Sequence, residues 1–193
     1  MGKSEEVQSR ERYRYIIFVT GPTACGKTTV AKVVADDLGL TYLEGDDFHP
    51  KANVEKMHHG EPLTDTDRWD WLHALRDHET MHPSDQKSQH LVITCSALKR
   101  EYRDVLREGG EKTPDLRVRF LYLDAPEAVL RERAAERKGH FAGADLVRSQ
   151  FEALERPAED EVDVVLLDVN RAEQEARRDA VDCVKHILSE SDK

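Results

Sequence analysis

Short apolar runs alternate with amphipathic segments along most of the chain. Runs of consecutive apolar residues, which are typical of strands buried on both faces, predict strands over 15–20, 41–43, 91–95, 118–123 and 162–167. Between these runs, apolar residues recur at helical spacing and predict helices over 27–38, 65–81, 98–107, 126–136, 144–153 and 172–188. Strands that alternate with helices indicate a parallel sheet covered on both sides, so we predict an α/β fold.

The remaining segments indicate how the chain is organised. Residues 1–13 are highly charged and lack periodicity, so we predict a loose N-terminal extension followed by a single domain over 14–193. The most loop-like interior stretches are 109–114, which begins with two glycines, and 137–143. A chain of 193 residues is long enough for one domain with a sizeable core and short for two.

Charge and composition narrow the range of partners. The chain has 29 Lys and Arg against 39 Asp and Glu, a net charge of −10, which argues against a protein that coats nucleic acid or an anionic membrane. Its apolar runs are far too short to cross a bilayer. The 3 cysteines have no paired spacing, which speaks against a disulfide framework or a zinc site and favours a cytoplasmic protein.

The turn after the first predicted strand carries the pattern G-x-x-x-x-G-K-T at residues 21–28. Its glycines let the backbone curl so that N–H groups point at a phosphate, and the next helix adds its positive N-terminal end. We predict that Lys27 reaches the β- and γ-phosphates of ATP and that the Thr28 hydroxyl takes a Mg²⁺ position. The predicted ATP-binding residues of this loop are Gly21, Ala24, Cys25, Gly26, Lys27, Thr28 and Thr29. A chance match is disfavoured because the pattern falls between a buried strand and an amphipathic helix.

Two later strands end in an acid, as a Walker B strand does. They end at Asp124 and Asp168, whereas the strand over 91–95, the likelier neighbour of the loop strand, ends in Cys-Ser. We favour the interpretation that Asp124 and Asp168 cap or turn the chain.

The second predicted strand ends in a group of acids, at the edge where open α/β sheets bind ligands. Phosphoryl transfer to an alcohol needs a carboxylate that accepts a hydrogen bond from the attacking hydroxyl and takes its proton. We predict that Asp46 is this base and that Glu44 or Asp47 holds a metal-bound water. Taken alone, an acid cluster after a strand is better explained as a solvated turn.

Several long motifs resemble the gluconokinases, a small P-loop family that phosphorylates D-gluconate. They are GDDFHPKANVEKMHHGEPLTDTDR at 45–68, CSALKREYRD at 95–104, RKGHF at 137–141, SQF at 149–151 and LERP at 154–157. The resemblance covers about 15–168, and Glu44 stands where it leads us to expect Asp. It implies the reaction ATP + D-gluconate → ADP + 6-phospho-D-gluconate, whose product enters the pentose phosphate pathway. It also implies a P-loop kinase fold with a five-stranded parallel sheet ordered 2-3-1-4-5, a mobile lid and a homodimer.

Gluconate offers a carboxylate and a row of hydroxyls, so its pocket needs a cation fork with mixed donors and acceptors. Arg68 is the candidate for the carboxylate; pairing with Asp65 or Asp67 is about as compatible with its chemistry, and the resemblance favours the substrate. Lys99 and Arg103, four apart, are predicted to share a helix face at the pocket, the alternative being a solvated cationic face. The predicted substrate contacts are Asp46, His49, Lys56, Arg68, Ser96, Lys99, Arg103, His140 and Gln150.

Four cations gather between Arg131 and Lys138 and run into Gly-His-Phe. Complementarity to a helix dipole alone would place cations there. We favour a lid, at about 131–145, that folds over ATP and excludes water. Within it, Arg133 and Arg137 are predicted to bind ATP, and Arg137 to stabilise charge on the transferring phosphate.

Two other functions remain open on the sequence alone. A kinase of the same fold for shikimate or a nucleoside monophosphate is the nearer one, but a base pocket calls for an apolar shelf after the second strand, where this chain has His, Asn, Lys and Arg. A regulatory protein that binds ATP without turnover is the other. Intact Lys27, Thr28 and Asp46, together with a cationic lid, speak against it.

Overall fold

The computed structural model describes residues 13–59, 61, 63–81, 90–136 and 142–189. Of the predicted N-terminal extension, only Tyr13 belongs to this part of the chain. The centre of the predicted lid, 137–141, lies outside the described residues, and Arg137 and His140 lie there with it.

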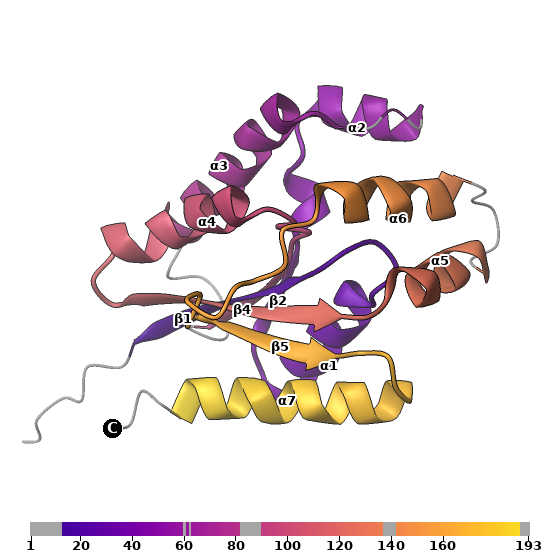
Figure 1. Ribbon diagram of the computed structural model, residues 1–193. Coiled ribbons are helices and arrows are strands. Elements are labelled where there is room, and N and C mark those ends of the chain that lie inside the picture. The colour runs from indigo at the N-terminus through magenta and orange to yellow at the C-terminus, as the bar shows by residue number, and fades with distance from the viewer. Residues whose placement is uncertain (1–12, 60, 62, 82–89, 137–141, 190–193) are drawn as a thin grey trace, which may run out of the picture.

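Five strands form one parallel sheet at the centre of the molecule (Figure 1). In sheet order they are β2 (Thr41–Glu44), β3 (Leu91–Thr94), β1 (Arg14–Thr20), β4 (Leu116–Asp124) and β5 (Val164–Asp168). The order 2-3-1-4-5 and the parallel pairing confirm the predicted fold class. Because β1 lies between β3 and β4, the turn that follows it opens at the middle of the carboxyl edge of the sheet.

Helices cover both faces of this sheet. They are α1 (Lys27–Leu38), α2 (Lys51–His58), α3 (Asp65–Met81), α4 (Arg100–Lys112), α5 (Glu127–Glu136), α6 (Ala142–Ala153) and α7 (Glu173–Ser189), with a 3₁₀ turn, η1, at Gly45–Phe48. Helices α1 and α7 pack on one face, α3 and α4 on the other, and α5 and α6 lie beyond the carboxyl ends of β4 and β5 (Figure 1). Within the described residues, no helix has the length and apolarity that a membrane crossing requires.

Burial of β1 on both faces explains the continuous apolar run in its sequence. Successive side chains of a strand point to opposite faces. Ile17 and Val19 therefore join the core under α1 and α7, while Ile16 and Phe18 join the core under α3 and α4. With both faces packed, β1 is a fixed support for the turn that follows Thr20.

The prediction of a loop at 109–114 is wrong for residues 109–112. Helix α4 continues through Gly109 and Gly110 to Lys112. Each glycine costs a helix about 1 kcal/mol relative to Ala. Packing outweighs this cost, because Leu106 and Gly109 are buried and a Cβ at Gly110 would lie only 3.3 Å from Cγ2 of Val118 on β4. Small residues here let the helix lie close to the sheet.

Candidate active site

The G-x-x-x-x-G-K-T turn connects β1 to α1 with a backbone that only small residues adopt readily. Gly21 has φ +135°, Ala24 has φ +66° and Gly26 has φ +97°. A Cβ at Gly21 would lie 2.8 Å from the carbonyl oxygen of Leu123, so both conformation and space require glycine there. The turn ends at the free N-terminus of α1, whose N–H groups and dipole favour an anion.

The Lys27 side chain folds back over this turn. Its ammonium Nζ donates hydrogen bonds to the carbonyl oxygens of Gly21, at 3.0 Å, and of Pro22, at 3.1 Å. The charge of Lys27 is therefore held at the turn itself, where the phosphates of a nucleotide would lie.

The Thr28 hydroxyl faces a carboxylate from the neighbouring part of the sheet. Its Oγ1 donates to Oε2 of Glu44, the last residue of β2, at 3.0 Å. Tyr42 and Thr94 also donate their hydroxyl protons to the Glu44 carboxylate. Burial alone would raise the pKa of Glu44, but the hydrogen bonds from Thr94, Tyr42 and Thr28 lower it below its usual range, so Glu44 is ionised.

These oxygen atoms suit a hard cation. A hydroxyl and an ionised carboxylate are ligands that Mg²⁺ prefers, and Mg²⁺ commonly takes only one or two protein ligands beside water and phosphate. The described residues contain no group of three or more His, Cys, Asp or Glu side chains arranged to hold a metal ion. Thr28 and Glu44 therefore fit a Mg²⁺ bound together with nucleotide phosphates.

Asp46 lies in η1, directly after the Gly45 peptide. Its side chain is 74% exposed, so it is open to a substrate. The surrounding protein raises the pKa of Asp46, the Glu44 and Asp47 charges raise it further, and the Lys27 charge acts in the opposite direction. The pKa of Asp46 therefore depends both on the charge of Lys27 in the turn and on the charges of its acidic neighbours.

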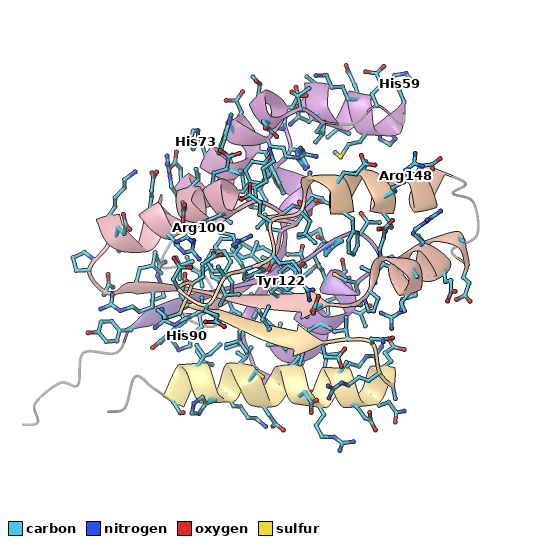
Figure 2. All side chains as sticks on the ribbon, viewed as in Figure 1. His59, His73, His90, Arg100, Tyr122 and Arg148 are labelled. Atoms are coloured by element: carbon cyan, nitrogen blue, oxygen red, sulfur yellow. The ribbon has the colours of Figure 1, made fainter. Side chains whose placement is uncertain are left out.

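His49 lies beside Asp46 and is almost fully buried. Its ring stacks on Trp71 of α3, with the centroids 4.2 Å apart, and its Nε2 is 3.9 Å from Oδ1 of Asp46. Burial lowers the pKa of His49 to about 4, and the Arg68 charge contributes to this shift, so the imidazole is neutral near pH 7. His58 and His59 are exposed, and Figure 2 shows His59 at the outer end of α2.

The predicted substrate cations pair with acids near this position. Lys56 Nζ is 2.7 Å from Oδ1 of Asp67. Arg68 and Lys99 share Asp65, with closest approaches of 3.7 and 2.7 Å. Both cations also lie within 6 Å of the Tyr102 ring centre, at 5.9 and 5.6 Å. The structure thus brings Arg68 and Lys99 together from two distant segments, and it shows the Arg68–Asp65 pairing that the sequence left as an alternative.

Arg103 is a correction to the predicted pocket. Its side chain is 1% exposed, and its guanidinium binds both carboxylate oxygens of Glu161, at 2.6 and 2.7 Å. The remaining Nη1 donates to the carbonyl oxygens of Ala97 and Glu155. Because these bonds occupy the guanidinium inside the protein, Arg103 fixes the segment before β5 and does not face a substrate.

A cleft of about 340 Å³ extends from the turn toward α5 and α7. Arg133 lines it and donates to the carbonyl oxygen of Val169 at 2.8 Å. The lining residues are Ala24, Cys25, Gly26, Thr29, Val30, Arg133, Glu136, Val169, Arg171, Glu173, Ala176 and Arg177. The sequence had not indicated the part of this lining that comes from 169–177.

Two more predicted contacts touch the phosphate-binding turn. The Gln150 side-chain oxygen accepts a hydrogen bond from the backbone N–H of Thr23 at 2.6 Å, which connects α6 to the turn. The Ser96 carbonyl accepts from the N–H of Gly21 at 3.3 Å. Both residues therefore lie at the turn, where a phosphate acceptor would meet ATP.

The two Walker B candidates take part in other contacts. Asp168 accepts from the backbone N–H of Asn170 at 2.8 Å and from Arg171 at 3.1 Å, as expected of a residue that turns the chain. Asp124 pairs with Arg156. The carboxylate that meets Thr28 is Glu44, on β2.

Known proteins resemble this chain over most of its length. Residues 16–160 match the model of a family described as an AAA domain. A probable gluconokinase of Schizosaccharomyces pombe is 43% identical over 183 residues, which is 95% of this chain and 94% of the relative. The thermoresistant gluconokinase of Escherichia coli is 41% identical over 157 residues, 81% of this chain and 86% of the relative. The crystal structure of a gluconokinase from Sinorhizobium meliloti has a TM-score of 0.78 at 38% identity, covering 93% of this chain and 96% of the other.

Proposed function

This chain belongs to the gluconokinase family, and we propose that the residues around its phosphate-binding turn carry out the family's reaction in the roles given below. The enzyme transfers the γ-phosphate of ATP to D-gluconate and releases ADP and 6-phospho-D-gluconate. The observation that carries the assignment of roles is the position of Asp46, an exposed carboxylate two residues after Glu44, which contacts Thr28 of the turn.

ATP binds with its phosphates on the turn at residues 21–28. Backbone N–H groups and the N-terminus of α1 neutralise phosphate charge, and Lys27 leaves its two carbonyl partners to meet the β- and γ-phosphates. The nucleoside extends into the cleft lined by Thr29, Arg133 and Val169. Arg137, next along the chain from α5, is proposed to stabilise charge on the transferring phosphate.

Thr28 and Glu44 are the residues that would hold Mg²⁺. A Mg²⁺ bound there would supply positive charge to the phosphates. Thr28 offers its hydroxyl oxygen, and Glu44 keeps that hydroxyl oriented through the 3.0 Å hydrogen bond. Of the two acids considered for this role, Glu44 is supported by its contact with Thr28.

Asp46 is proposed as the base. It accepts a hydrogen bond from the C6 hydroxyl of gluconate, orients that oxygen at the γ-phosphorus and takes its proton as the P–O bond forms. Neutral His49, 3.9 Å from Asp46, contributes a hydrogen-bonding group to the same pocket without adding a charge that would weaken the base.

Arg68 and Lys99 are proposed to receive the gluconate carboxylate. Both cations contact Asp65, and Lys99 also lies 3.6 Å from Glu101, so a gluconate carboxylate would replace these acids as the partner of the two cations. Lys56, Ser96, His140 and Gln150 are proposed to contact the hydroxyls. In a panel of acceptors tested with ATP and Mg²⁺, we expect gluconate to be phosphorylated fastest. Equal turnover of glycerate or shikimate would contradict this pocket.

We further propose a homodimer and a cytoplasmic location. Val162 is 92% exposed just before the edge strand β5, and Leu166 on β5 is 56% exposed, a kind of apolar edge that a second copy would protect. The free cysteines Cys25, Cys95 and Cys183 suit a reducing compartment. Light scattering of the purified protein tests the dimer, and a monomer at micromolar concentration would contradict it.

A further inference from the structure

The Glu44 carboxylate accepts hydrogen bonds from three hydroxyl groups. Oε2 accepts from Thr28 at 3.0 Å and from Tyr42 at 2.5 Å, while Oε1 accepts from Thr94. Only Thr28 belongs to the phosphate-binding turn; Tyr42 and Thr94 come from the sheet. Tyr42 and Thr94 therefore hold both carboxylate oxygens of Glu44 without any contribution from the turn.

The sheet itself brings these side chains together. Tyr42 and Glu44 are two residues apart on β2, so their side chains point to the same face. Thr94 is the partner of Glu44 in the parallel pairing of β2 with β3. Strand pairing thus sets the positions of all three residues, with no loop involved.

Thr94 also fixes the peptide that leads to the base. Its hydroxyl, which donates to Glu44, accepts from the N–H of Gly45 at 3.1 Å. The Gly45 carbonyl accepts from the indole of Trp71 at 2.7 Å. A Cβ at Gly45 would lie 1.9 Å from the Thr94 carbonyl oxygen, so the two strands approach closely here. Gly45, the single residue between Glu44 and Asp46, is therefore held through both its N–H and its carbonyl group.

The held carboxylate determines how Thr28 presents its hydroxyl. A hydroxyl has one proton and two lone pairs. Because the proton is directed to Glu44, the lone pairs of Thr28 point elsewhere and are available to a cation. If Glu44 turned away, the Thr28 hydroxyl would be free to rotate.

We propose that Tyr42 and Thr94 are positioning residues that lock Glu44 against Thr28 and so strengthen the binding of Mg²⁺ with nucleotide. The inference rests on the proposed function, in which Thr28 and Glu44 form the Mg²⁺ side of the site. Glu44 is one methylene longer than the Asp expected at this position, and Tyr42 and Thr94 restrain the extra freedom that this length brings.

Calorimetric titration with ADP tests this role without turnover. The measured quantity is the ratio of the ADP dissociation constant in EDTA to that in saturating Mg²⁺. For Tyr42→Phe and Thr94→Val this ratio should fall roughly 10-fold, the usual scale for losing a partner of a metal ligand. The ADP dissociation constant in EDTA should stay within about twofold of wild type, because the turn itself is unchanged.

Two control variants separate the hydroxyl from the side chain that carries it. Thr94→Ser keeps the hydroxyl and should retain the wild-type ratio. Tyr13→Phe removes a phenolic hydroxyl just before β1, at the opposite end of the parallel sheet from Glu44 at the end of β2, and should also leave the ratio unchanged. Equal weakening of ADP binding in EDTA and in Mg²⁺ by Tyr42→Phe would indicate a general structural defect and overturn the inference.

Glu44→Gln and Thr28→Ala distinguish the inference from its premise. If both lower the ratio while Tyr42→Phe and Thr94→Val do not, the positioning role is wrong and the Mg²⁺ side of the proposed function stands. If neither Glu44→Gln nor Thr28→Ala lowers the ratio, the proposed Mg²⁺ side is itself wrong, and the role of Tyr42 and Thr94 falls with it.

Discussion

The imidazole of His49 stacks on the indole of Trp71, with ring centroids 4.2 Å apart and planes inclined by 17°. The same indole donates to the carbonyl oxygen of Gly45 at 2.7 Å. Trp71 therefore supports the proposed base from two sides, through the peptide before Asp46 and through the ring beside it. The stack also excludes water from His49, which disfavours the charged imidazolium and so couples protein stability to pH.

The pH dependence of folding should reveal the buried neutral His49. Its pKa is about 4 in the folded protein and about 6.5 in an unfolded chain, so the unfolded state binds more protons between these values. Stability is complete above pH 6.5 and is lost as the pH falls toward 4. From pH 7.5 to pH 5 this group should cost roughly 2 kcal/mol. Urea unfolding at both pH values measures it.

A pair of His variants isolates this contribution. His49→Gln should flatten the fall in unfolding free energy between pH 7.5 and pH 5, whereas His58→Gln, on the exposed end of α2, should follow the wild-type profile. An unchanged slope in His49→Gln would show that His49 is not the group that titrates.

Asp46→Asn should lower kcat by roughly 10²–10⁴-fold, the scale of a lost general base. The substitution keeps the shape of the side chain but cannot take a proton, so KM for gluconate should change little. Asp47→Asn removes the same charge one residue away and is the matched control. A fall in kcat of less than about tenfold would mean that Asp46 only positions gluconate.

The acid limb of the activity profile should lie above the range of an ordinary Asp. The base acts when ionised, and surrounding protein together with the Glu44 and Asp47 charges raises the pKa of Asp46. The value of kcat/KM should therefore fall with decreasing pH at a pH higher than about 3.9. Asp47→Asn should shift the limb to lower pH, because it removes one of the charges that raise this pKa.

Lys27→Ala should abolish turnover and leave the fold intact. Among the residues that the structure describes, the Lys27 ammonium has only carbonyl oxygens of the turn as hydrogen-bond partners, and other residues pack α1 into the core, so the protein does not need this charge to fold. Circular dichroism and single-turnover assays measure the two properties. Lys185→Ala on α7, whose side chain is 59% exposed, should behave as wild type. Substantial activity in Lys27→Ala would contradict the role of the turn.

Local patterns in the sequence were sufficient where neighbouring residues determine the structure. Helix α1 begins and ends where predicted, because a Gly-rich turn precedes Lys27 and Gly39 follows Leu38 with φ +65°. The phosphate-binding turn could be predicted equally well, since its conformation depends on its own glycines and on the strand and helix beside it. The continuous apolar run of β1 predicted a strand buried on both faces, which is typical of a parallel sheet.

Contacts between distant segments could not be predicted in this way. Arg103 and Glu161 are 58 residues apart, and no periodicity links them. Lys99 and Arg103 do not share a helix face, because Lys99 is the N-cap of α4, in extended conformation with φ −102° and ψ 154°. The contact between Tyr42 and Glu44 was the easiest of the missed contacts to predict, since the two residues lie two apart in the β2 segment.

Arg103→Met should destabilise the protein strongly and leave gluconate binding unchanged. The substitution leaves Glu161 buried, 2% exposed, with Arg107 as its remaining cationic partner at 2.7 Å. Burial alone would raise the pKa of Glu161, whereas hydrogen bonds from Arg103 and Arg107 lower it to about 2. Breaking such a pair typically costs about 3–5 kcal/mol. Urea unfolding at pH 7 measures the loss.

Arg100→Met is the matched control for this substitution. Arg100 is one turn earlier on α4 and pairs with Asp160, but the two side chains are 47% and 64% exposed, so the loss should be below about 1 kcal/mol. At a temperature where Arg103→Met remains folded, KM for gluconate should stay within about twofold of wild type, because Arg103 faces the protein interior. A rise of more than about tenfold in KM for gluconate, with KM for ATP unchanged, would return Arg103 to the substrate pocket.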